Sequence, residues 1–186
     1  MAFAMKKFSN MNNSQVIWKI LKRTLIIFLL GYLMYWFPFF RQTASGTWEL
    51  SPFSHTRIPG VLQRIGVCYG IAAMMIHFLP KKMVWIMSII FLLGYWLVMY
   101  LGGDYTMTGN IGLQIDTWLL GENHLYHGEG IAFDPEGVLS TIPSVVNVII
   151  GYYAGVFIRE KGNSYETVAK LMIAGAVLLY FVRGAG

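Results

Sequence analysis

Long apolar stretches separated by short polar segments are the first pattern along the chain. A stretch of about 20 apolar residues is long enough to cross the hydrocarbon core of a bilayer as a helix. Because polar or charged segments interrupt the pattern, each stretch is expected to form a span of its own. The pattern predicts an all-α, polytopic transmembrane helix bundle of about five spans, at residues 24–40, 61–80, 83–102, 138–158 and 168–183.

Composition supports the same class of protein. Of the 186 residues, 56% are hydrophobic and 12% are charged, against about 25% charged residues in soluble domains. This excludes a disordered chain, and the single cysteine, Cys68, excludes an internal disulfide. Neither a repeat nor a linker divides the chain, so we predict one membrane domain over residues 1–186.

The charges predict the orientation of the spans. Ten basic residues fall on one side: Lys6, Lys7, Lys19, Lys22, Arg23, Lys81, Lys82, Arg159, Lys161 and Lys170. Seven of the nine acids fall on the other: Glu49, Asp104, Asp116, Glu122, Glu129, Asp134 and Glu136. The positive-inside rule therefore predicts a cytoplasmic N-terminus, with outer loops at residues 41–58 and 103–137. Since the basic residues flank spans and form no patch of their own, we expect no nucleic-acid partner.

Arg64 is the first candidate for chemistry. Pro59 and Gly60 are typical of a helix start, which puts Arg64 roughly 8 Å inside the outer end of the second span. An ionisable residue at that depth usually faces a bundle interior or a wet cavity and has a function. The alternative is structural: Arg64 snorkels outward or pairs with a loop carboxylate such as Asp134. The neighbouring Gln63 lies on a different face of the helix and is a weaker candidate.

The long outer loop carries two histidines, His124 and His127, among several acids. The set of possible ligands is incomplete for zinc, so we expect no metal. His124 is the better candidate for general acid–base chemistry, because imidazole titrates near neutral pH. These residues alone leave an enzyme and a carrier equally open.

Two pairs of small residues recur at helical spacing. Gly66 and Gly70 lie in the second predicted span, and Gly151 and Gly155 lie in the fourth. Small residues four apart let helix backbones approach closely in membranes. We therefore expect both pairs to mark helix–helix contacts.

Two motifs resemble a known family. Residues 57–65 read RIPGVLQRI, and the outer loop carries Ile115-Asp116, LGENHLY at 120–126 and FDPEGVLST at 133–141. In order and spacing they resemble signatures of the heparan-α-glucosaminide N-acetyltransferase family and its bacterial relatives. The resemblance covers roughly residues 1–178, and both motifs lie on the same predicted side of the membrane.

The resemblance implies a multi-pass protein of the bacterial inner membrane, surrounded by lipid, that transfers acetyl from cytosolic acetyl-CoA to an amino sugar outside. Family members have more than five spans and a catalytic histidine in a His-x-x-Trp-Asn-Gly segment, expected before Met1. We therefore expect a chain truncated at both ends and inactive alone.

Within the chain, the resemblance suggests a site of five residues. Arg64 would contact an anion or oxyanion of the acetyl donor. The sugar side would be lined by Asp116, His124, Asp134 and Glu136, because carboxylates suit an ammonium group and hydroxyls. Two alternatives stay open: an amino-sugar or oligosaccharide carrier without acetyl transfer, and a non-catalytic membrane module. Homo-oligomerisation is open as well.

Overall fold

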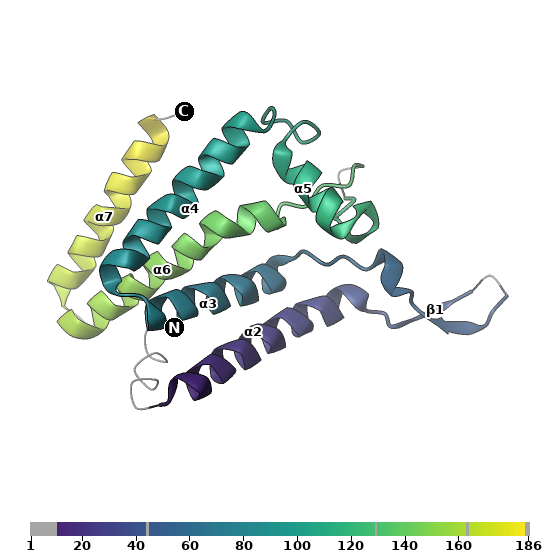
Figure 1. Cartoon of the computed structure of the whole chain (residues 1–186), viewed down its shortest axis with the longest axis horizontal. Helices are drawn as coiled ribbons and strands as arrows, with labels where there is room; N and C mark the ends of the chain where they lie inside the picture. Colours follow the sequence, from purple (N-terminus) through teal and green to yellow (C-terminus); the bar gives the residue numbers. More distant parts are fainter. Residues whose placement is uncertain (1–10, 44, 129, 163, 185–186) are drawn as a thin grey trace.

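The structure, a computed structural model, describes residues 11–43, 45–128, 130–162 and 164–184, without the side chains of residues 181 and 182. Lys6, Lys7 and Glu129, which entered the sequence-based predictions, lie outside the described residues. The described chain is predominantly helical, as the sequence predicted. Element labels follow Figure 1.

Five long helices occupy the five predicted spans. They are α2 (Asn13–Trp36), α3 (Val61–Phe78), α4 (Lys81–Leu101), α6 (Val138–Lys161) and α7 (Tyr165–Gly184). Within the described residues, α3, α4 and α6 are long and apolar enough to cross a membrane. The protein is thus an all-α membrane protein, while five as the number of spans stays a prediction.

The boundaries of the first span need a correction. α2 ends at Trp36 and does not continue to residue 40, because Phe37 precedes Pro38 and has an extended backbone. At its other end α2 begins at Asn13, so its first half carries Lys19, Lys22 and Arg23. These three residues, which were predicted to precede the span, are therefore helical.

α3 is the central helix of the bundle. One cluster of buried side chains joins α3 to α4 and α6: Cys68, Ala72, Met75, Val84, Val145 and Ile149. A second cluster joins it to α2: Val16, Ile20 and Ala73. Several of these side chains are small, so the helices pack closely without large core residues.

The predicted glycine contacts form at the first of the two pairs. A Cβ atom at Gly70 would lie 2.6 Å from Thr24 Oγ1, and one at Gly66 would lie 3.0 Å from the carbonyl oxygen of Thr24. These glycines therefore permit the close approach of α2 and α3. Gly151 differs, since a Cβ there would meet no atom within 4 Å. At Gly151 the expected helix contact does not form within the described chain.

The two predicted outer loops gather at one end of the bundle (Figure 1). The first contains an antiparallel hairpin, β1 (Phe40–Gln42) and β2 (Trp48–Leu50), and the short helix η2 (Phe53–His55). The second contains α5 (Ile111–Leu120) and η3 (Glu122–His124), so it is more ordered than the predicted loop. Asn110 begins α5 by accepting a hydrogen bond from the Leu113 amide at 2.9 Å.

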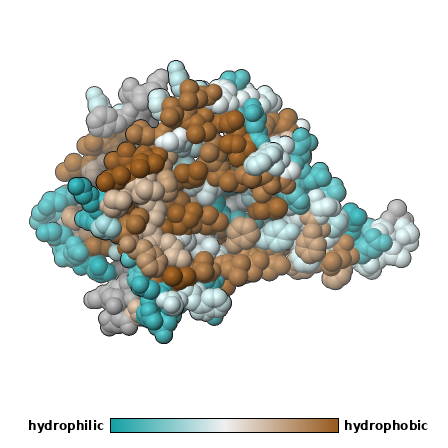
Figure 2. All heavy atoms as spheres, in the orientation of Figure 1, coloured by the Kyte–Doolittle hydropathy of each residue, from teal (hydrophilic) through white to brown (hydrophobic). Residues whose placement is uncertain are grey.

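Surface hydropathy matches a membrane protein. Figure 2 shows hydrophobic atoms across the middle of the visible face and hydrophilic atoms toward its two ends. One of these ends carries α5 and the hairpin (Figure 1). Polar chemistry is thus concentrated at the ends of an apolar bundle, and the site described next lies at the α5 end.

Candidate functional site

Arg57 organises the polar end of the bundle. Its guanidinium donates to both carboxylate oxygens of Asp134, at 2.8 and 2.7 Å, and to Glu136 Oε2 at 2.7 Å. The rings of Tyr35 and Tyr126 each lie 4.9 Å from the guanidinium carbon. Arg57 is therefore held by two acids and two aromatic faces at once.

The pair of Arg57 and Asp134 is largely shielded from water. The side chain of Asp134 is fully buried, and that of Arg57 is 16% exposed. Hydrogen bonding to Asp134 raises the pKa of Arg57, so the arginine stays charged. This ion pair fixes the segment that precedes α6 against the segment that precedes α3.

Asp116 joins α5 to the start of α6. Its Oδ1 atom accepts a hydrogen bond from the Val138 amide at 2.8 Å. This satisfies an N-terminal donor of α6, whose own capping position, Gly137, supplies no side chain. A Cβ atom at Gly137 would collide with the Asp116 carboxylate. Glycine at this position therefore makes the contact between the two helices possible.

The environment of Asp116 disfavours its charge. The residue is 3% exposed, and burial is the largest of the effects that raise the pKa of its carboxyl above the ordinary value. The negative charge of Asp134 adds to the increase, while the hydrogen bond from Val138 opposes it. Asp116 is thus a carboxylate that a bound cation would stabilise.

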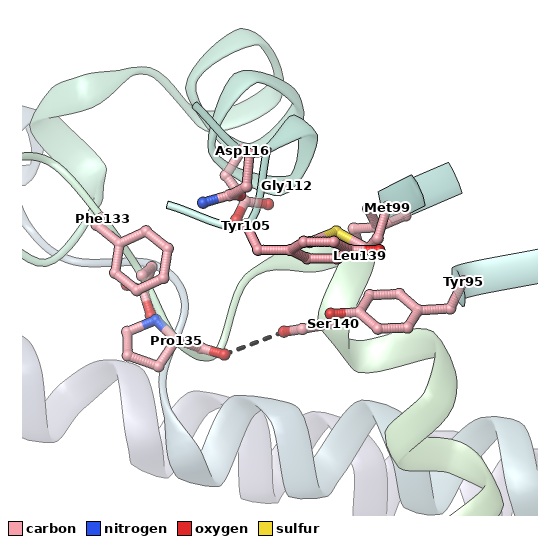
Figure 3. Close-up of a pocket in the computed structure, with 11 residues that line it drawn as sticks. Tyr95, Met99, Tyr105, Gly112, Asp116, Phe133, Pro135, Leu139 and Ser140 are labelled. Atoms are coloured by element: carbon pink, nitrogen blue, oxygen red, sulfur yellow. Dashed lines mark hydrogen bonds between the residues drawn. The ribbon is translucent and has the colours of Figure 1, made fainter. Parts of the chain in front are cut away.

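A cavity of about 220 Å³ opens beside these acids. Its wall includes Asp116 and Asp134, together with Tyr95 from the end of α4 and Ser140 from the start of α6. The rings of Tyr95 and Phe133 come from opposite sides of it, and Ser140 Oγ donates to the carbonyl oxygen of Pro135 at 3.0 Å (Figure 3). Two acids, several aromatic rings and a hydroxyl therefore surround one small space, which we call the acidic cavity. The remaining lining residues are Met99, Tyr105, Asn110, Gly112, Pro135 and Leu139.

Arg64 forms no ion pair within the described residues, so the alternative in which it pairs with Asp134 is wrong. Its Nε atom donates to Ser144 Oγ at 3.0 Å, and its terminal nitrogens donate to Ser144 Oγ and to the carbonyl oxygens of Ser140 and Pro135. Asp134 is taken by Arg57, which lies on the approach to α3. Arg64 is thus bound by neutral oxygens, and its positive charge lies directly behind the wall of the acidic cavity.

His124 joins the two outer segments. Its Nδ1 atom lies 2.8 Å from the carbonyl oxygen of Thr56, and its own carbonyl oxygen accepts from the Ile58 amide at 3.0 Å. Since a carbonyl oxygen only accepts, Nδ1 carries the proton, and Nε2 is the basic nitrogen of a neutral ring. His124 is not among the residues that line the acidic cavity.

The two histidines do not converge on a metal site. His127 Nδ1 lies 3.0 Å from the carbonyl oxygen of Leu125, which occupies that nitrogen. Within the described residues, no three His, Cys, Asp or Glu side chains are grouped as metal ligands would be.

The structure thus brings some of the predicted residues together and adds others. Asp116 and Asp134 share the acidic cavity, Glu136 and Arg64 flank the start of α6, and His124 lies apart. Sequence reasoning missed Arg57, Tyr35 and Tyr126. Arg57 stands three residues before Gly60, where the helix start was predicted, and it belongs to the RIPGVLQRI motif. Its place in this motif could have identified it as a candidate site residue.

The apolar bundle and the buried polar cluster define an all-α membrane protein with an acidic cavity at one end. No family model matches the chain. Heparan-alpha-glucosaminide N-acetyltransferase of Mus musculus is 31% identical to it over an aligned region that covers 74% of this chain and 27% of the mouse protein. The enzyme of the same name from Homo sapiens is 32% identical over an aligned region that covers 57% of this chain and 24% of the human protein.

The chain is therefore related to the heparan-α-glucosaminide N-acetyltransferase family, which confirms the resemblance of the two motifs. The match covers about a quarter of the length of these curated relatives.

Proposed function

We propose that the chain forms part of a membrane-bound N-acetyltransferase that moves acetyl from acetyl-CoA to an amino sugar. The observation that carries the proposal is the acidic cavity, which Asp116 and Asp134 both line. The relation to enzymes named N-acetyltransferases supports the reaction class.

The acidic cavity suits the acceptor. An amino sugar brings a positive ammonium group, several hydroxyls and the apolar face of a ring. The raised pKa of Asp116 means that this carboxylate gains from a cationic partner. Tyr95 and Phe133 offer aromatic faces for the sugar ring.

Acetyl transfer needs a neutral amine, because only its lone pair attacks the thioester carbonyl. The amine nitrogen forms the amide bond, the carbon–sulfur bond breaks, and the amine proton must pass to a base. Asp116 is suited to receive that proton, since its raised pKa makes it a stronger base than an ordinary aspartate. His124 is a second candidate, with Nε2 as the basic atom.

Arg64 is the candidate for contact with the donor. Its charge is bound by neutral oxygens and so retains attraction for an anion. A developing negative charge on the thioester oxygen would be stabilised by such a fixed donor. Glu136 belongs to the same end of the bundle, where Arg57 holds it.

The proposed location is the bacterial inner membrane, with acetyl-CoA supplied from the cytosol and the sugar from outside.

A transfer assay separates this function from a carrier. Membranes from cells that express the complete gene to which this chain belongs should move a radioactive acetyl group from acetyl-CoA to glucosamine, and glucose should stay unlabelled because it has no amine. Uptake of labelled glucosamine into sealed vesicles, without acetylation in the presence of acetyl-CoA, would overturn the enzyme and favour the carrier.

A further inference from the structure

Another hollow lies along α2, at the opposite end of the bundle from the acidic cavity. Val16 and Ile20 pack α2 against α3, and α2 lies at the edge of the bundle (Figure 1). The hollow has a volume of about 620 Å³ and shares no lining residue with the acidic cavity. We call it the basic furrow, and its lining residues are Trp18, Leu21, Lys22, Thr24, Leu25 and Phe28.

The basic furrow follows one stripe of α2. Trp18, Lys22, Leu25 and Phe28 succeed one another at spacings of three or four residues, so they share one face of the helix. Trp18 and Leu25 are 68% and 57% exposed, so the described chain leaves this face largely uncovered. From Trp18 to Phe28 the helix rises roughly 15 Å, which is half of a hydrocarbon core about 30 Å thick. The furrow therefore has the length of one lipid leaflet.

The packing of α2 on α3 gives the depth of Lys22. Thr24 contacts Gly70 of α3, which lies roughly 12 Å before the end of that helix at Phe78. Since the two helices run in opposite directions (Figure 1), Lys22 lies nearer to this end, roughly 9 Å inside it. α3 is long and apolar enough to cross a membrane. The ammonium of Lys22 must therefore extend toward the lipid headgroups at this end.

The charge of Lys22 has no acid to neutralise it within the described residues. The first acid of the whole sequence is Glu49, which belongs to the hairpin at the other end of α2. The neighbouring Lys19 donates to the Met11 sulfur at 3.3 Å, a neutral acceptor. This end of α2 thus carries surplus positive charge, which attracts an anion.

Trp18 suits the boundary between headgroups and acyl chains. It lies one turn from Lys22, toward the start of α2, and its indole combines a large apolar body with one N–H donor. Such side chains are enriched where a bilayer meets water. Leu25 and Phe28 continue the furrow in the other direction and offer only apolar atoms. The furrow therefore changes from basic to apolar along its length, as a phospholipid does from anionic to apolar.

We propose that the basic furrow binds one phospholipid with an anionic headgroup, such as phosphatidylglycerol. The lipid phosphate accepts hydrogen bonds from the Lys22 ammonium, the Trp18 indole packs beside the glycerol, and one acyl chain runs along Leu25 to Phe28. Phosphatidylcholine fits the apolar part equally well, but its choline group carries a positive charge that offsets the attraction to this end of α2. The net charge of the headgroup therefore decides between two lipids with the same chains.

The test measures lipid contact beside the furrow with a local probe. In a Cys68→Ser background, a bimane fluorophore is attached at Leu29→Cys, one turn beyond Leu25, in the chain purified in dodecyl maltoside. Phosphatidylglycerol and phosphatidylcholine with the same brominated acyl chains are titrated, because bromine quenches a fluorophore only at close range. Phosphatidylglycerol should reach half-quenching at a roughly fivefold lower mole fraction, the factor expected for one lysine near an anionic lipid.

Variants of Lys22 and two controls assign the preference to the furrow. Lys22→Gln should bring the two lipids to the same half-quenching point, and Lys22→Arg should retain the preference because it keeps the charge. Lys161→Gln is the matched control, since Lys161 is an exposed lysine at the end of α6. A fluorophore at Leu93→Cys on α4, a position that is 60% exposed, reports ordinary lipid contact and should show no preference.

Equal quenching by the two lipids with Lys22 intact would overturn the proposal without relying on a Lys22 variant. A preference that persists in Lys22→Gln would overturn it as well, because the charge would then act from elsewhere. Glycerol phosphate, a headgroup without acyl chains, should leave the quenching unchanged. If it displaced phosphatidylglycerol, the site would belong to small anions and not to a lipid. None of these measurements involves acetyl transfer, so the proposed enzyme is tested separately.

Discussion

Arg57 and Asp134 are the residues on which the polar end depends most. Asp134 is fully buried, and Arg57 supplies both of its close charge-assisted hydrogen bonds. A buried carboxylate that loses its only strong partner keeps its desolvation cost, which makes the loss larger than the net value of the pair. The stability of this end should therefore respond sharply to Arg57.

We expect Arg57→Ala to lower the free energy of unfolding by about 3 kcal/mol, because it leaves Asp134 buried and unpaired. Arg57→Lys should recover part of the loss, since an ammonium group restores the charge but not the planar fork. Thermal unfolding in detergent measures both. Arg41→Ala is the matched control, because Arg41 lies exposed on the hairpin. A melting temperature for Arg57→Ala equal to that of the control would contradict the structural role.

Asp116 gives a prediction for pH. Burial raises the pKa of its carboxyl above the ordinary value of an aspartate in the folded chain, so the charged form is penalised by folding. Stability from this group is therefore greatest at low pH, and it falls as the pH rises through the raised folded pKa. Asp116→Asn keeps an oxygen that can accept from Val138 and removes the charge. Melting curves between pH 4 and pH 8, roughly spanning this range, should show wild type losing stability relative to Asp116→Asn as the pH rises.

A control variant and a contradicting result complete the prediction for Asp116. Asp116→Ala should be less stable than Asp116→Asn at every pH by about 1 kcal/mol, because it removes the acceptor at the start of α6. A difference between wild type and Asp116→Asn that does not change with pH would mean that Asp116 has an ordinary pKa.

Among the helices, the contact between α3 and α6 links the site to the bundle. Arg64 on α3 reaches the Ser144 hydroxyl and the carbonyl oxygen of Ser140, both within α6. The first turns of α6 are thereby held between Arg64 on one side and Asp116 on the other. These two contacts therefore fix the position of Leu139 and Ser140, the residues of α6 that line the acidic cavity.

A double-mutant cycle measures the link between the helices. Arg64→Lys and Ser144→Ala should each destabilise the protein, and the double variant should lose less than the sum, with a coupling energy of about 1 kcal/mol. Unfolding in detergent provides the readout. Ser88→Ala is the control, because the Ser88 hydroxyl donates to the Val84 carbonyl of its own helix. Strict additivity for Arg64 and Ser144 would show that their contact contributes nothing.

At the scale of the whole molecule, the sequence predicted the class of fold well, because apolar runs of bilayer length are a strong signal. Predicted and observed bounds of α3 and α4 agree within a few residues. The ends of α2 were less predictable, since Lys19 and Lys22 interrupt the apolar pattern without interrupting the helix. The order within residues 103–137 was also missed, because α5 is short and depends on the Asn110 cap.

The candidate site was only partly predictable. Asp116 and Asp134 were identified from motifs, and both line the cavity. Arg64 was considered as a partner of Asp134 in one of two alternatives, but Arg57 takes that place. Spacing along a helix gives depth in the membrane, but it does not tell which of two arginines at the same end reaches a carboxylate in a distant segment.

The predicted orientation can be tested on the whole chain. In a Cys68→Ser background, a cysteine at His127 should react with an impermeant thiol reagent in intact cells, because residue 127 is predicted to lie outside. A cysteine at Lys82, in the turn between α3 and α4, should react only after the cells are permeabilised. Reversal of the two labelling patterns would show that the basic end faces outward.

The central claim is that the acidic cavity binds the amine of the acceptor sugar, and the most direct measurement is the steady-state kinetics of acetyl transfer by Asp116→Asn. With the negative charge removed and the hydrogen bond to α6 retained, the KM for glucosamine should rise by roughly tenfold, the loss of one charge-assisted contact. The KM for acetyl-CoA should stay unchanged, because the donor does not contact this carboxylate. A KM for glucosamine equal to that of wild type would place the acceptor elsewhere and contradict the account.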